Sequence, residues 1–351
     1  MKVFKNTPLF YDLIIDWFQF TLFGFTIDEA SRFIFKCGID DLTHTPSGLN
    51  GYTDTYTYGH KCHMMLNFKR EDMGINILFS GSACRDYEET FDFSELLMKI
   101  SRLSDDQYNF TRIDIAIDYF GHDFTIKTIQ NKADHGAMTS RFRTYTVLYE
   151  ASLGNERIGE QIQFGSKSSD LHIVFYNKLK ERLNAGYEIK DKNCNHWVRC
   201  ELRFRQKQAN LLFNEMVKDL DKTGKIIRGI LRHYLSFKVE SNGDKRHRCR
   251  NEECRWWKLF TDNVPACRLE SEAIGSNIFR KRRYLDMKLT KLISMLYITD
   301  RELFQEILDS GVEKINKSDL DVINAHFILN NQQILQMNEL RTIVENYQKN
   351  K

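Results

Sequence analysis

The sequence predicts an α+β fold, in which an N-terminal mixed or antiparallel sheet with flanking helices precedes a mainly helical C-terminal region. Two observations support this prediction. Up to residue 205, short segments alternate apolar and polar side chains with the period of two expected of strands. After residue 206, apolar side chains recur every three to four residues, as they do on helices. We therefore expect a sheet-based domain over 1–205 and a helical region over 206–351.

The strands of the sheet domain are predicted from runs rich in β-branched and aromatic residues. They cover residues 12–22, 62–68, 74–81, 108–120, 160–165, 171–178 and 195–205. The second and third of these runs flank a polar turn and should form a hairpin. Two helices are expected among the strands: one at 26–38, with Thr26 as its N-cap and Gly38 as its stop, and one at 91–103, with Ser94 as its cap.

Further helices are expected near the C-terminus. Residues 299–311 begin with Thr299 and Glu302 at the spacing of a capping box, and Gly311 provides the stop. Residues 318–348 continue as one or two helices. We therefore expect the helical region to extend almost to the end of the sequence.

The composition is typical of a globular cytoplasmic protein. Hydrophobic residues make up 42% of the 351 residues and only 3 are proline, which excludes a disordered or fibrous chain. The 8 cysteines are scattered, which favours reduced thiols. Asp12 and Asp16 interrupt the apolar N-terminus, and no run of about 18 apolar residues occurs, so we expect no signal peptide and no membrane span. Since the net charge is only +3, any argument for a nucleic-acid partner depends on where the charges lie.

The segment TRIDIAIDYF places two carboxylates on one face of a strand. Side chains alternate faces along a strand, so Arg112, Asp114 and Asp118 share one face with Ala116, while the isoleucines between them face the core. Carboxylates on so apolar a strand are costly unless they are solvated, paired or bound to a metal. The segment therefore predicts either a metal site or a strand whose polar face lies in water.

The segment FGSKSSDLHIVFYNKLKE places His172, Val174, Tyr176 and Lys178 on one face of the next strand. A lysine beside a tyrosine can anchor a phosphate and favour the phenolate, which is the nucleophilic form. The alternative is a strand tyrosine whose hydroxyl is simply hydrated.

In WVRCELRFR, charged residues alternate with apolar ones. Arg199, Glu201, Arg203 and Arg205 share one face of this strand. One carboxylate among three arginines suits a metal ligand flanked by contacts to phosphates, or a face held together by salt bridges.

Several motifs are absent from the sequence. It lacks the GxxxxGK[ST] motif, so hydrolysis of ATP by a P-loop is excluded. It also lacks an HxH pair that could form a histidine metal site, and HKCH at 60–63 has the wrong spacing to replace that pair. Cys249 and Cys254 with His247 have poor spacing for a zinc site.

Basic residues concentrate in the last third of the chain, in KRHRCR (245–250), RWWK (255–258) and FRKRR (279–283). Cations interleaved with Trp256, Trp257, Phe279 and Tyr284 suit a surface that follows phosphates and stacks bases. The alternative is a solvated helix face above a buried tryptophan.

Taken in order, these segments resemble the Rep_trans-type initiators of rolling-circle plasmid replication, together with the related phage replication initiation factors and the relaxases of integrative conjugative elements. The resemblance covers most of residues 10–285. It is carried by IDWFQFTL, LFSGSACRDYEE, FTRIDIAIDYF, FGSKSSDLHIVFYNKLKE, WVRCELRFR and RHYLSF with RWWKLF. Two positions depart from the family pattern: Val174, where an arginine is common, and Arg203, where a second acid is common.

The resemblance implies a role for each candidate site residue. Tyr176 corresponds to the nucleophile, with Lys178 beside it. Asp114, Glu201 and Asp118 are the candidate ligands of a Mg²⁺ or Mn²⁺ ion. The residues expected to contact DNA are Arg112, His172, Arg199, Arg203, Arg205, Arg280, Lys281, Arg282 and Arg283.

The activity implied by the resemblance is nicking and religation of one DNA strand at an origin through a covalent 5′-phosphotyrosine. The partners would be partly single-stranded DNA and a host helicase, since the chain has no motor motif; a homodimer stays open. Two rival functions are a metal-dependent nuclease that activates water and a DNA-binding protein of the same fold without catalysis.

Overall fold

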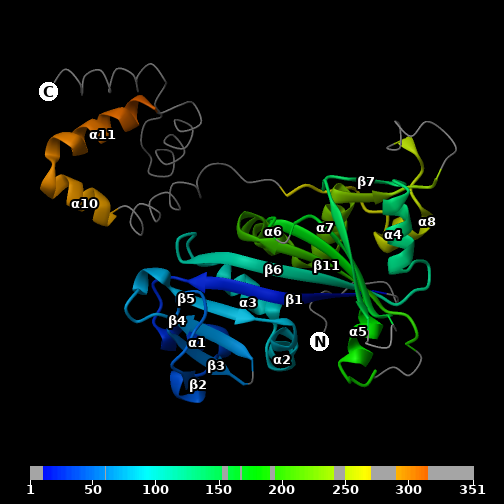
Figure 1. Cartoon of the computed structure of the whole chain (residues 1–351). Helices are drawn as coiled ribbons and strands as arrows, with labels where there is room; N and C mark the ends of the chain where they lie inside the picture. The colour runs from blue at the N-terminus through cyan, green and yellow to red at the C-terminus, as the bar shows by residue number, and fades with distance from the viewer. Residues whose placement is uncertain are drawn as a thin grey trace. The chain divides into compact units, whose positions relative to one another are not determined.

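The structure is a computed structural model that describes residues 11–59, 61–151, 157–166, 168–189, 194–240, 250–269 and 290–314. Within these residues, a ten-stranded sheet runs in the order β2-β3-β4-β5-β1-β6-β11-β10-β9-β8, with every neighbouring pair antiparallel (Figure 1). Its strands are β1 (Tyr11–Leu22), β2 (Thr43–Thr45), β3 (Asp54–Tyr58), β4 (Cys62–Leu66), β5 (Ile75–Phe79), β6 (Tyr108–Tyr119), β8 (Tyr145–Ala151), β9 (Arg157–Phe164), β10 (Leu171–Asn177) and β11 (Val198–Arg205). The predicted α+β class and the 62–68/74–81 hairpin are confirmed.

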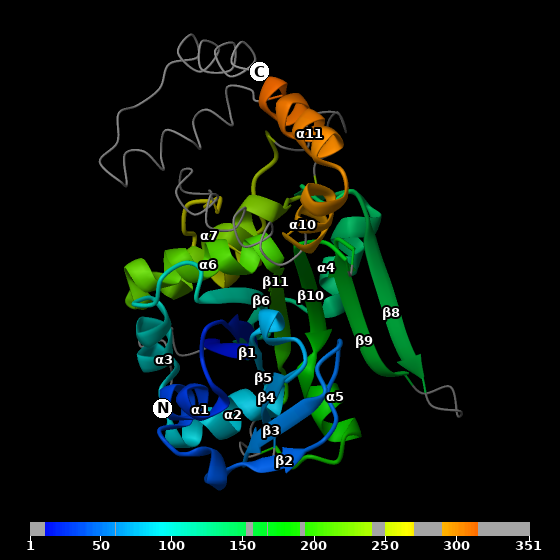
Figure 2. The same ribbon diagram turned by 90° about the vertical axis from the view of Figure 1, so that its left-hand side faces the viewer.

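Helices cover one face of this sheet. They are α1 (Ile27–Phe35), α2 (Gly81–Thr90), α3 (Phe93–Ile100), α4 (Ile126–Asp134), α6 (Gln206–Lys218), α7 (Thr223–Tyr234) and α8 (Arg255–Phe260), with the short α5 (Lys178–Asn184) directly after β10. Their apolar side chains join those of alternate strand residues in a core rich in phenylalanine, including Phe18, Phe79, Phe110 and Phe204. A small second sheet pairs β7 (Met138–Ser140) with β12 (Leu235–Phe237). Figure 2 shows the β8–β9 pair at one edge of the large sheet.

Two of the predicted helix ends need correction. Thr26 caps α1 in a capping box as predicted, but α1 ends at Phe35, because Lys36 adopts the left-handed conformation before Gly38 is reached. Asp92, rather than Ser94, caps α3, because its carboxylate accepts a hydrogen bond from the backbone N–H of Ser94.

The chain divides into two compact units, and the division does not fall at residue 206. One unit comprises Met1–Leu103 and Tyr108–Glu270, and the other Ser104–Gln107 and Ser271–Lys351. Helix α6 does begin at Gln206, but it packs on β6 and β11 and therefore belongs with the sheet. As a division between DNA nicking and DNA binding, the boundary at 205 stays a prediction.

The second unit contains α10 (Thr290–Thr299) and α11 (Arg301–Glu313) among the described residues. The predicted start and stop of the helix at 299–311 are both wrong. The backbone N–H of Leu303 donates to the carboxylate of Asp300, and Gly311 lies within α11. The helix predicted over 318–348 lies outside the described residues.

The predicted stacking surface around the tryptophans is corrected in part. Trp257 is fully buried, and Trp256 packs against Phe124 and Phe237 at the edge of the core. At Trp257 the alternative of a buried tryptophan therefore holds, because α8 turns this ring toward the sheet. The basic residues at 245–249 and 279–283 lie outside the described residues.

Asn210 on α6 completes the edge of β6 where β11 has ended. The last β11 residue, Arg205, pairs with Arg112, so the backbone of Phe110 has no β11 partner. The buried amide of Asn210 takes that place: it accepts from the Phe110 N–H at 3.1 Å and donates to the Phe110 carbonyl at 2.9 Å.

We expect Asn210→Ala to lower the free energy of unfolding by about 2–4 kcal/mol, because two backbone groups lose their partner in a buried place. Urea denaturation followed by circular dichroism measures this loss. Lys207→Ala, an exposed change on the same helix, is the control and should stay within about 0.5 kcal/mol of the wild type. Equal stability of the two variants would show that water replaces the amide.

Candidate active site

The three sequence motifs that carry charged residues meet on the face of the sheet opposite the helices. Strand β11 lies between β10 and β6, and its register places Arg203 between His172 and Asp114, Glu201 between Val174 and Ala116, and Arg199 between Tyr176 and Asp118. Residues far apart in the sequence therefore become direct neighbours. We call this the polar face.

Tyr176 is the first member of a chain of contacts on the polar face. Its hydroxyl donates to Glu201 Oε1 at 2.5 Å, and the other carboxylate oxygen, Oε2, accepts from the Arg203 guanidinium at 2.6 and 2.9 Å. Arg203 Nε also lies 3.8 Å from Asp114 Oδ2, to which Arg112 donates at 2.5 Å. Two arginines thus hold two buried carboxylates beside the tyrosine.

A second, more deeply buried ion-pair group lies next to the first. Arg199 donates to both oxygens of Asp118 at 2.7 Å and to Asp16 Oδ1 at 2.9 Å. The side chains of Arg199 and Asp118 are only 6% and 5% exposed. Such a fully paired group is hard to break, because removing one partner leaves an uncompensated buried charge.

Asp16 and Trp17 reach the polar face through a β-bulge, and sequence reasoning missed both as site residues. In the pairing of β1 with β6, Ile15 faces Ile115 but Trp17 faces Asp114, so Asp16 is the extra residue. The sequence does contain the signal: the apolar core positions of β1 change from odd numbers at Leu13 and Ile15 to even numbers from Phe18 onward.

The motif LFSGSACRDYEE is explained by this bulge. The guanidinium of Arg85 on α2 donates to the carbonyl of Ile15, the residue just before the bulge. Gly81, at the start of α2, lies so close that a β-carbon there would be 3.6 Å from the Asp16 carboxylate. The motif therefore packs α2 against the bulge and supports the position of Asp16.

Trp17 extends the polar network away from Tyr176. The Arg112 guanidinium lies over the indole, 4.1 Å from the ring centroid, and the indole N–H donates to the Gln19 side chain at 3.2 Å. Gln19 in turn donates to Asn76 at 3.1 Å, and Asn76 donates to Thr21 at 3.1 Å. A continuous series of contacts therefore connects Tyr176 on β10 to Asn76 on β5.

Burial sets the protonation of the central groups. It raises the pKa of the Tyr176 phenol, and the negative charge of Glu201 raises it further. Lys178 begins α5 and pairs with Glu181 at 2.5 Å, 5.5 Å above the Tyr176 ring. Burial and Glu201 thus oppose the phenolate form of Tyr176 that an adjacent lysine can favour. Burial also raises the pKa of Asp114 to about 6, although Arg112 opposes that shift.

Three of the predicted roles do not fit the positions of their residues. His172 is fully buried, and Arg199 is buried and committed to two carboxylates, so neither presents a surface to DNA. Asp118 has both oxygens occupied by Arg199, which argues against its predicted role as a metal ligand. Arg112, Arg203 and Arg205 remain partly exposed on the polar face. The predicted DNA contacts Arg280, Lys281, Arg282 and Arg283 lie outside the described residues.

The remaining candidate metal ligands, Asp114 and Glu201, are carboxylates, which is a ligand type that suits a divalent cation. Their hard oxygens lie on either side of the Arg203 guanidinium, so a positive charge already occupies the space between them. Mg²⁺ commonly binds through one or two carboxylates and completes its shell with water and substrate phosphates. No group of three or more His, Cys, Asp and Glu residues in the described part of the chain could hold a metal. The residues present therefore fit a metal site with two carboxylate ligands, from which the Arg203 guanidinium would have to move away.

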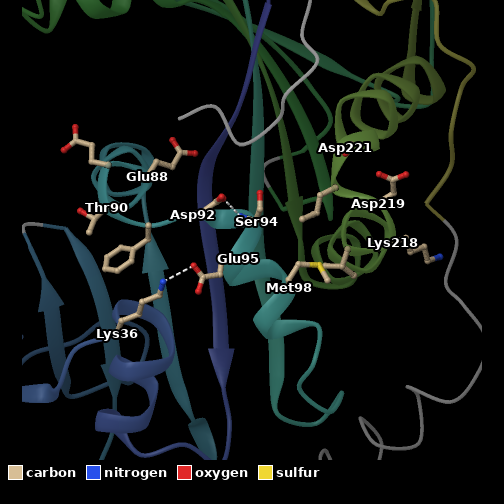
Figure 3. Close-up of a pocket in the computed structure, with 14 residues that line it drawn as sticks. Lys36, Glu88, Thr90, Asp92, Ser94, Glu95, Met98, Lys218, Asp219 and Asp221 are labelled. Atoms are coloured by element: carbon tan, nitrogen blue, oxygen red, sulfur yellow. Dashed lines mark hydrogen bonds and ion pairs between the residues drawn. The ribbon is translucent and has the colours of Figure 1, made fainter.

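A cavity of about 820 Å³ lies away from the polar face, between the end of α2, α3 and the end of α6 (Figure 3). Its lining contains six carboxylates against two lysines: Glu88, Glu89, Asp92, Glu95, Asp219 and Asp221, with Lys36 and Lys218. Three of these carboxylates are already paired: Glu95 with Lys36 and Lys99, Glu88 with Arg85, and Asp219 with Lys222. So acidic a cavity repels phosphates, and the polar face is the better candidate for DNA chemistry.

Comparison with known proteins agrees with this geometry. Residues 108–312, which include the three charged strands, match the family described as "Replication initiation factor". The chain belongs to this family. Residues 12–99 match a second description, "Rolling Circle replication initiation protein N-terminal domain". The chain is therefore of the rolling-circle initiator and relaxase type.

A relative and a solved structure extend the comparison. The chain is 27% identical over 317 residues to a Bacillus subtilis (strain 168) protein named "Putative DNA relaxase NicK", covering 87% of this chain and 86% of that protein. The fold is similar to that of a rolling-circle replication initiator protein from Geobacillus stearothermophilus, with a TM-score of 0.64 and 23% identity. That match covers 75% of this chain and all of the other. None of the described helices has the length and apolar character needed to cross a membrane.

Because burial places the pKa of Asp114 near 6, above its ordinary value of 3.8, the ionised carboxylate destabilises the fold at neutral pH. We expect Asp114→Asn, without metal, to raise the free energy of unfolding by about 1–3 kcal/mol above pH 6. The gain should shrink as the pH falls through 6 and vanish near pH 4, where the wild-type carboxyl is neutral in both states. Denaturant melts with EDTA across this pH range measure it.

Asp118→Asn is the matched control on the same strand. It leaves the buried Arg199 guanidinium short of a negative partner, so we expect a loss of about 3 kcal/mol or more. A loss of similar size in both variants would show that Asp114 stabilises the fold as an ordinary ion pair.

Proposed function

We propose that this protein nicks and rejoins one strand of DNA, with Tyr176 as the nucleophile. The observation that supports this most directly is the hydrogen bond from the Tyr176 hydroxyl to Glu201 beside two partly exposed arginines. A phenol whose proton already points at a carboxylate, among guanidinium groups that suit a phosphate, has the parts that phosphoryl transfer to tyrosine needs. Family membership and the similarity to an initiator fold support the same activity.

In the proposed reaction, the Tyr176 oxygen attacks the scissile phosphorus and its proton passes to Glu201 Oε1, 2.5 Å away. The bond from phosphorus to the 3′-oxygen breaks, and that oxygen takes a proton from solvent to become a 3′-hydroxyl. The products are a 5′-phosphotyrosyl link and an end that can prime synthesis. Because the ester bond is conserved, the 3′-hydroxyl can reverse the attack and reseal the strand without ATP.

The arginines of the polar face have two roles in this proposal. In the DNA-free state Arg112 and Arg203 neutralise Asp114 and Glu201, and both side chains stay about a quarter exposed, at 23% and 26%. Arg203 can therefore turn toward a phosphate of the bound strand, and Arg112 can meet one from its position over Trp17. A Mg²⁺ or Mn²⁺ ion held by Asp114 and Glu201 would neutralise the scissile phosphate and align it.

The proposed substrate is DNA that is at least partly single-stranded, because the scissile strand has to reach a tyrosine on a sheet surface. Since the sequence has no P-loop motif, we propose that a separate host helicase unwinds the duplex.

We expect Tyr176→Phe to abolish nicking and covalent adduct formation while DNA binding is kept, since only the hydroxyl is lost. A denaturing gel of the protein with an end-labelled origin strand detects the adduct, and Tyr149→Phe, on the edge strand β8, is the control. An adduct that persists in the Tyr176 variant would move the nucleophile elsewhere. Cleavage without any adduct in the wild type would favour the water-activating nuclease, and binding without cleavage the inactive DNA-binding protein.

We expect Asp114→Asn and Glu201→Gln each to slow nicking by orders of magnitude, with partial rescue by added Mn²⁺, because the amides lack the charge that attracts a hard cation. Calorimetric titration of Mn²⁺ into the folded variants measures the binding loss independently of activity. Glu95→Gln, in the acidic cavity, is the control. Normal nicking by both site variants in limiting Mg²⁺ would contradict the carboxylate-metal site.

A further inference from the structure

We propose that Trp17, held by Arg112, is a stacking platform for an unpaired base of the DNA strand next to the scissile phosphate. This inference rests on the proposed function and deepens it, because it assigns one part of the polar face to bases and another to phosphates. Three observations carry it: the bulge that brings the half-buried Trp17 to the polar face, the contacts that fix its ring, and the distribution of charge across the sheet.

The bulge gives Trp17 a position that an unbroken strand would not. With regular alternation after Leu13 and Ile15, residue 17 would point into the core and residue 18 out of it. Asp16 is inserted as the extra residue, so Trp17 faces the same side as Asp114, its partner on β6. The largest apolar side chain of β1 is thereby placed, half-buried, on a face otherwise composed of charged and polar groups.

The ring is held before any ligand arrives. The Arg112 guanidinium covers the indole at 4.1 Å from the ring centroid while its own nitrogens bind Asp114. The indole N–H is fixed by Gln19, which is itself fixed by Asn76. Because both rotations of the ring are restricted, a base stacking on this pair would lose little further side-chain entropy to order it. Aromatic rings and arginine planes are the two surfaces on which proteins stack unpaired bases.

The charged residues of the polar face are distributed differently on the two sides of Trp17. On its β6 and β11 side the strands carry three partly exposed arginines, Arg112, Arg203 and Arg205. Two of them pair with the carboxylates of Asp114 and Glu201. On the other side, β5, β4, β3 and β2 contain neither lysine nor arginine, and the residues that continue the face are uncharged or histidine, such as Asn76, His63 and Thr57. Phosphates are therefore favoured over β6 and β11, and a base flanking them is directed toward β1, where Trp17 is the first aromatic ring.

The test uses binding, with chemistry blocked by Tyr176→Phe in every protein. Affinity for a fluorescein-labelled oligothymidylate of about 16 nucleotides, a length typical of single-strand binding sites, is measured by anisotropy at several salt concentrations. The parent, which keeps Trp17, is compared with Trp17→Phe and Trp17→Leu. We expect Trp17→Leu to bind about 5- to 100-fold more weakly, and Trp17→Phe to lie closer to the parent, since stacking on an aromatic ring is what is lost.

The salt dependence separates stacking from a disturbed arginine row. Loss of a stacked base removes no phosphate contact, so the slope of log affinity against log salt should be the same for Trp17→Leu as for the parent. A flatter slope would mean that the variant displaced Arg112 or its neighbours, and unchanged affinity would mean that the ring only fills space; either result overturns the proposal. Circular dichroism melts confirm that the variants compared are folded.

A second measurement locates the base. On an oligonucleotide whose nick position has been mapped by the Tyr176 adduct, a single abasic site is moved along the strand. An abasic site at one position near the nick should weaken binding to the protein that keeps Trp17. The same abasic site should leave binding to the Trp17→Leu protein unchanged, because the missing base and the missing ring remove the same stacking interaction. Equal effects of every abasic site on both proteins would refute the stacking role. Failure to form any adduct would instead refute the nicking function, while the oligothymidylate result would stand by itself.

Discussion

The polar face depends on how its buried carboxylates are neutralised. Asp118 and Asp16 share Arg199, and the pair of Arg199 with Asp118 is so deeply buried and so fully bonded that it behaves as part of the scaffold. Asp114 and Glu201 are equally buried, but their partners Arg112 and Arg203 are about a quarter exposed and can reach solvent. Pairing of carboxylates with arginines therefore gives two groups: a fixed one around Arg199, and a second one, with Arg112 and Arg203, that can be rearranged. Arg199 is the strand neighbour of Tyr176, but only the second group bonds the Tyr176 hydroxyl, through Glu201.

This arrangement is possible only in one register of the sheet. Asp114, Tyr176 and Glu201 lie on three strands that are distant in sequence, and each reaches the polar face because its strand pairs as it does. A slip of one residue in β11 would turn Glu201 and the arginines into the phenylalanine-rich core. The core thus holds the register, and the register assembles the site. Asn210 and Arg85 contribute at the two irregular places, where β6 passes the end of β11 and where β1 bulges.

Much of this could be predicted from the sequence, and the failures have physical causes. Alternation of side chains gave the strands, the shared face of Asp114 and Asp118, and the face of Glu201, because a strand's period is local. Alternation does not show which residues will form ion pairs across strands. The ion pair between Asp118 and Arg199 on the neighbouring strand therefore could not be predicted. The burial of His172 likewise depends on neighbouring strands. Asp16 and Trp17 could have been found, since the core positions of β1 change parity between Ile15 and Phe18.

The charges of the rearrangeable group, formed by Asp114, Glu201, Arg112 and Arg203, balance in the absence of DNA. Two ionised carboxylates and two guanidinium groups cancel, and the raised pKa of the Tyr176 phenol keeps a further negative charge from forming beside Glu201. A DNA phosphate entering this group adds a negative charge, and both guanidinium groups are already paired. If an arginine turns to the phosphate, it leaves a buried carboxylate uncompensated, which is costly. A divalent cation held by Asp114 and Glu201 would satisfy both at once, so the metal dependence that we propose rests on the charge balance of the DNA-bound site and not on the ligand count of the free one.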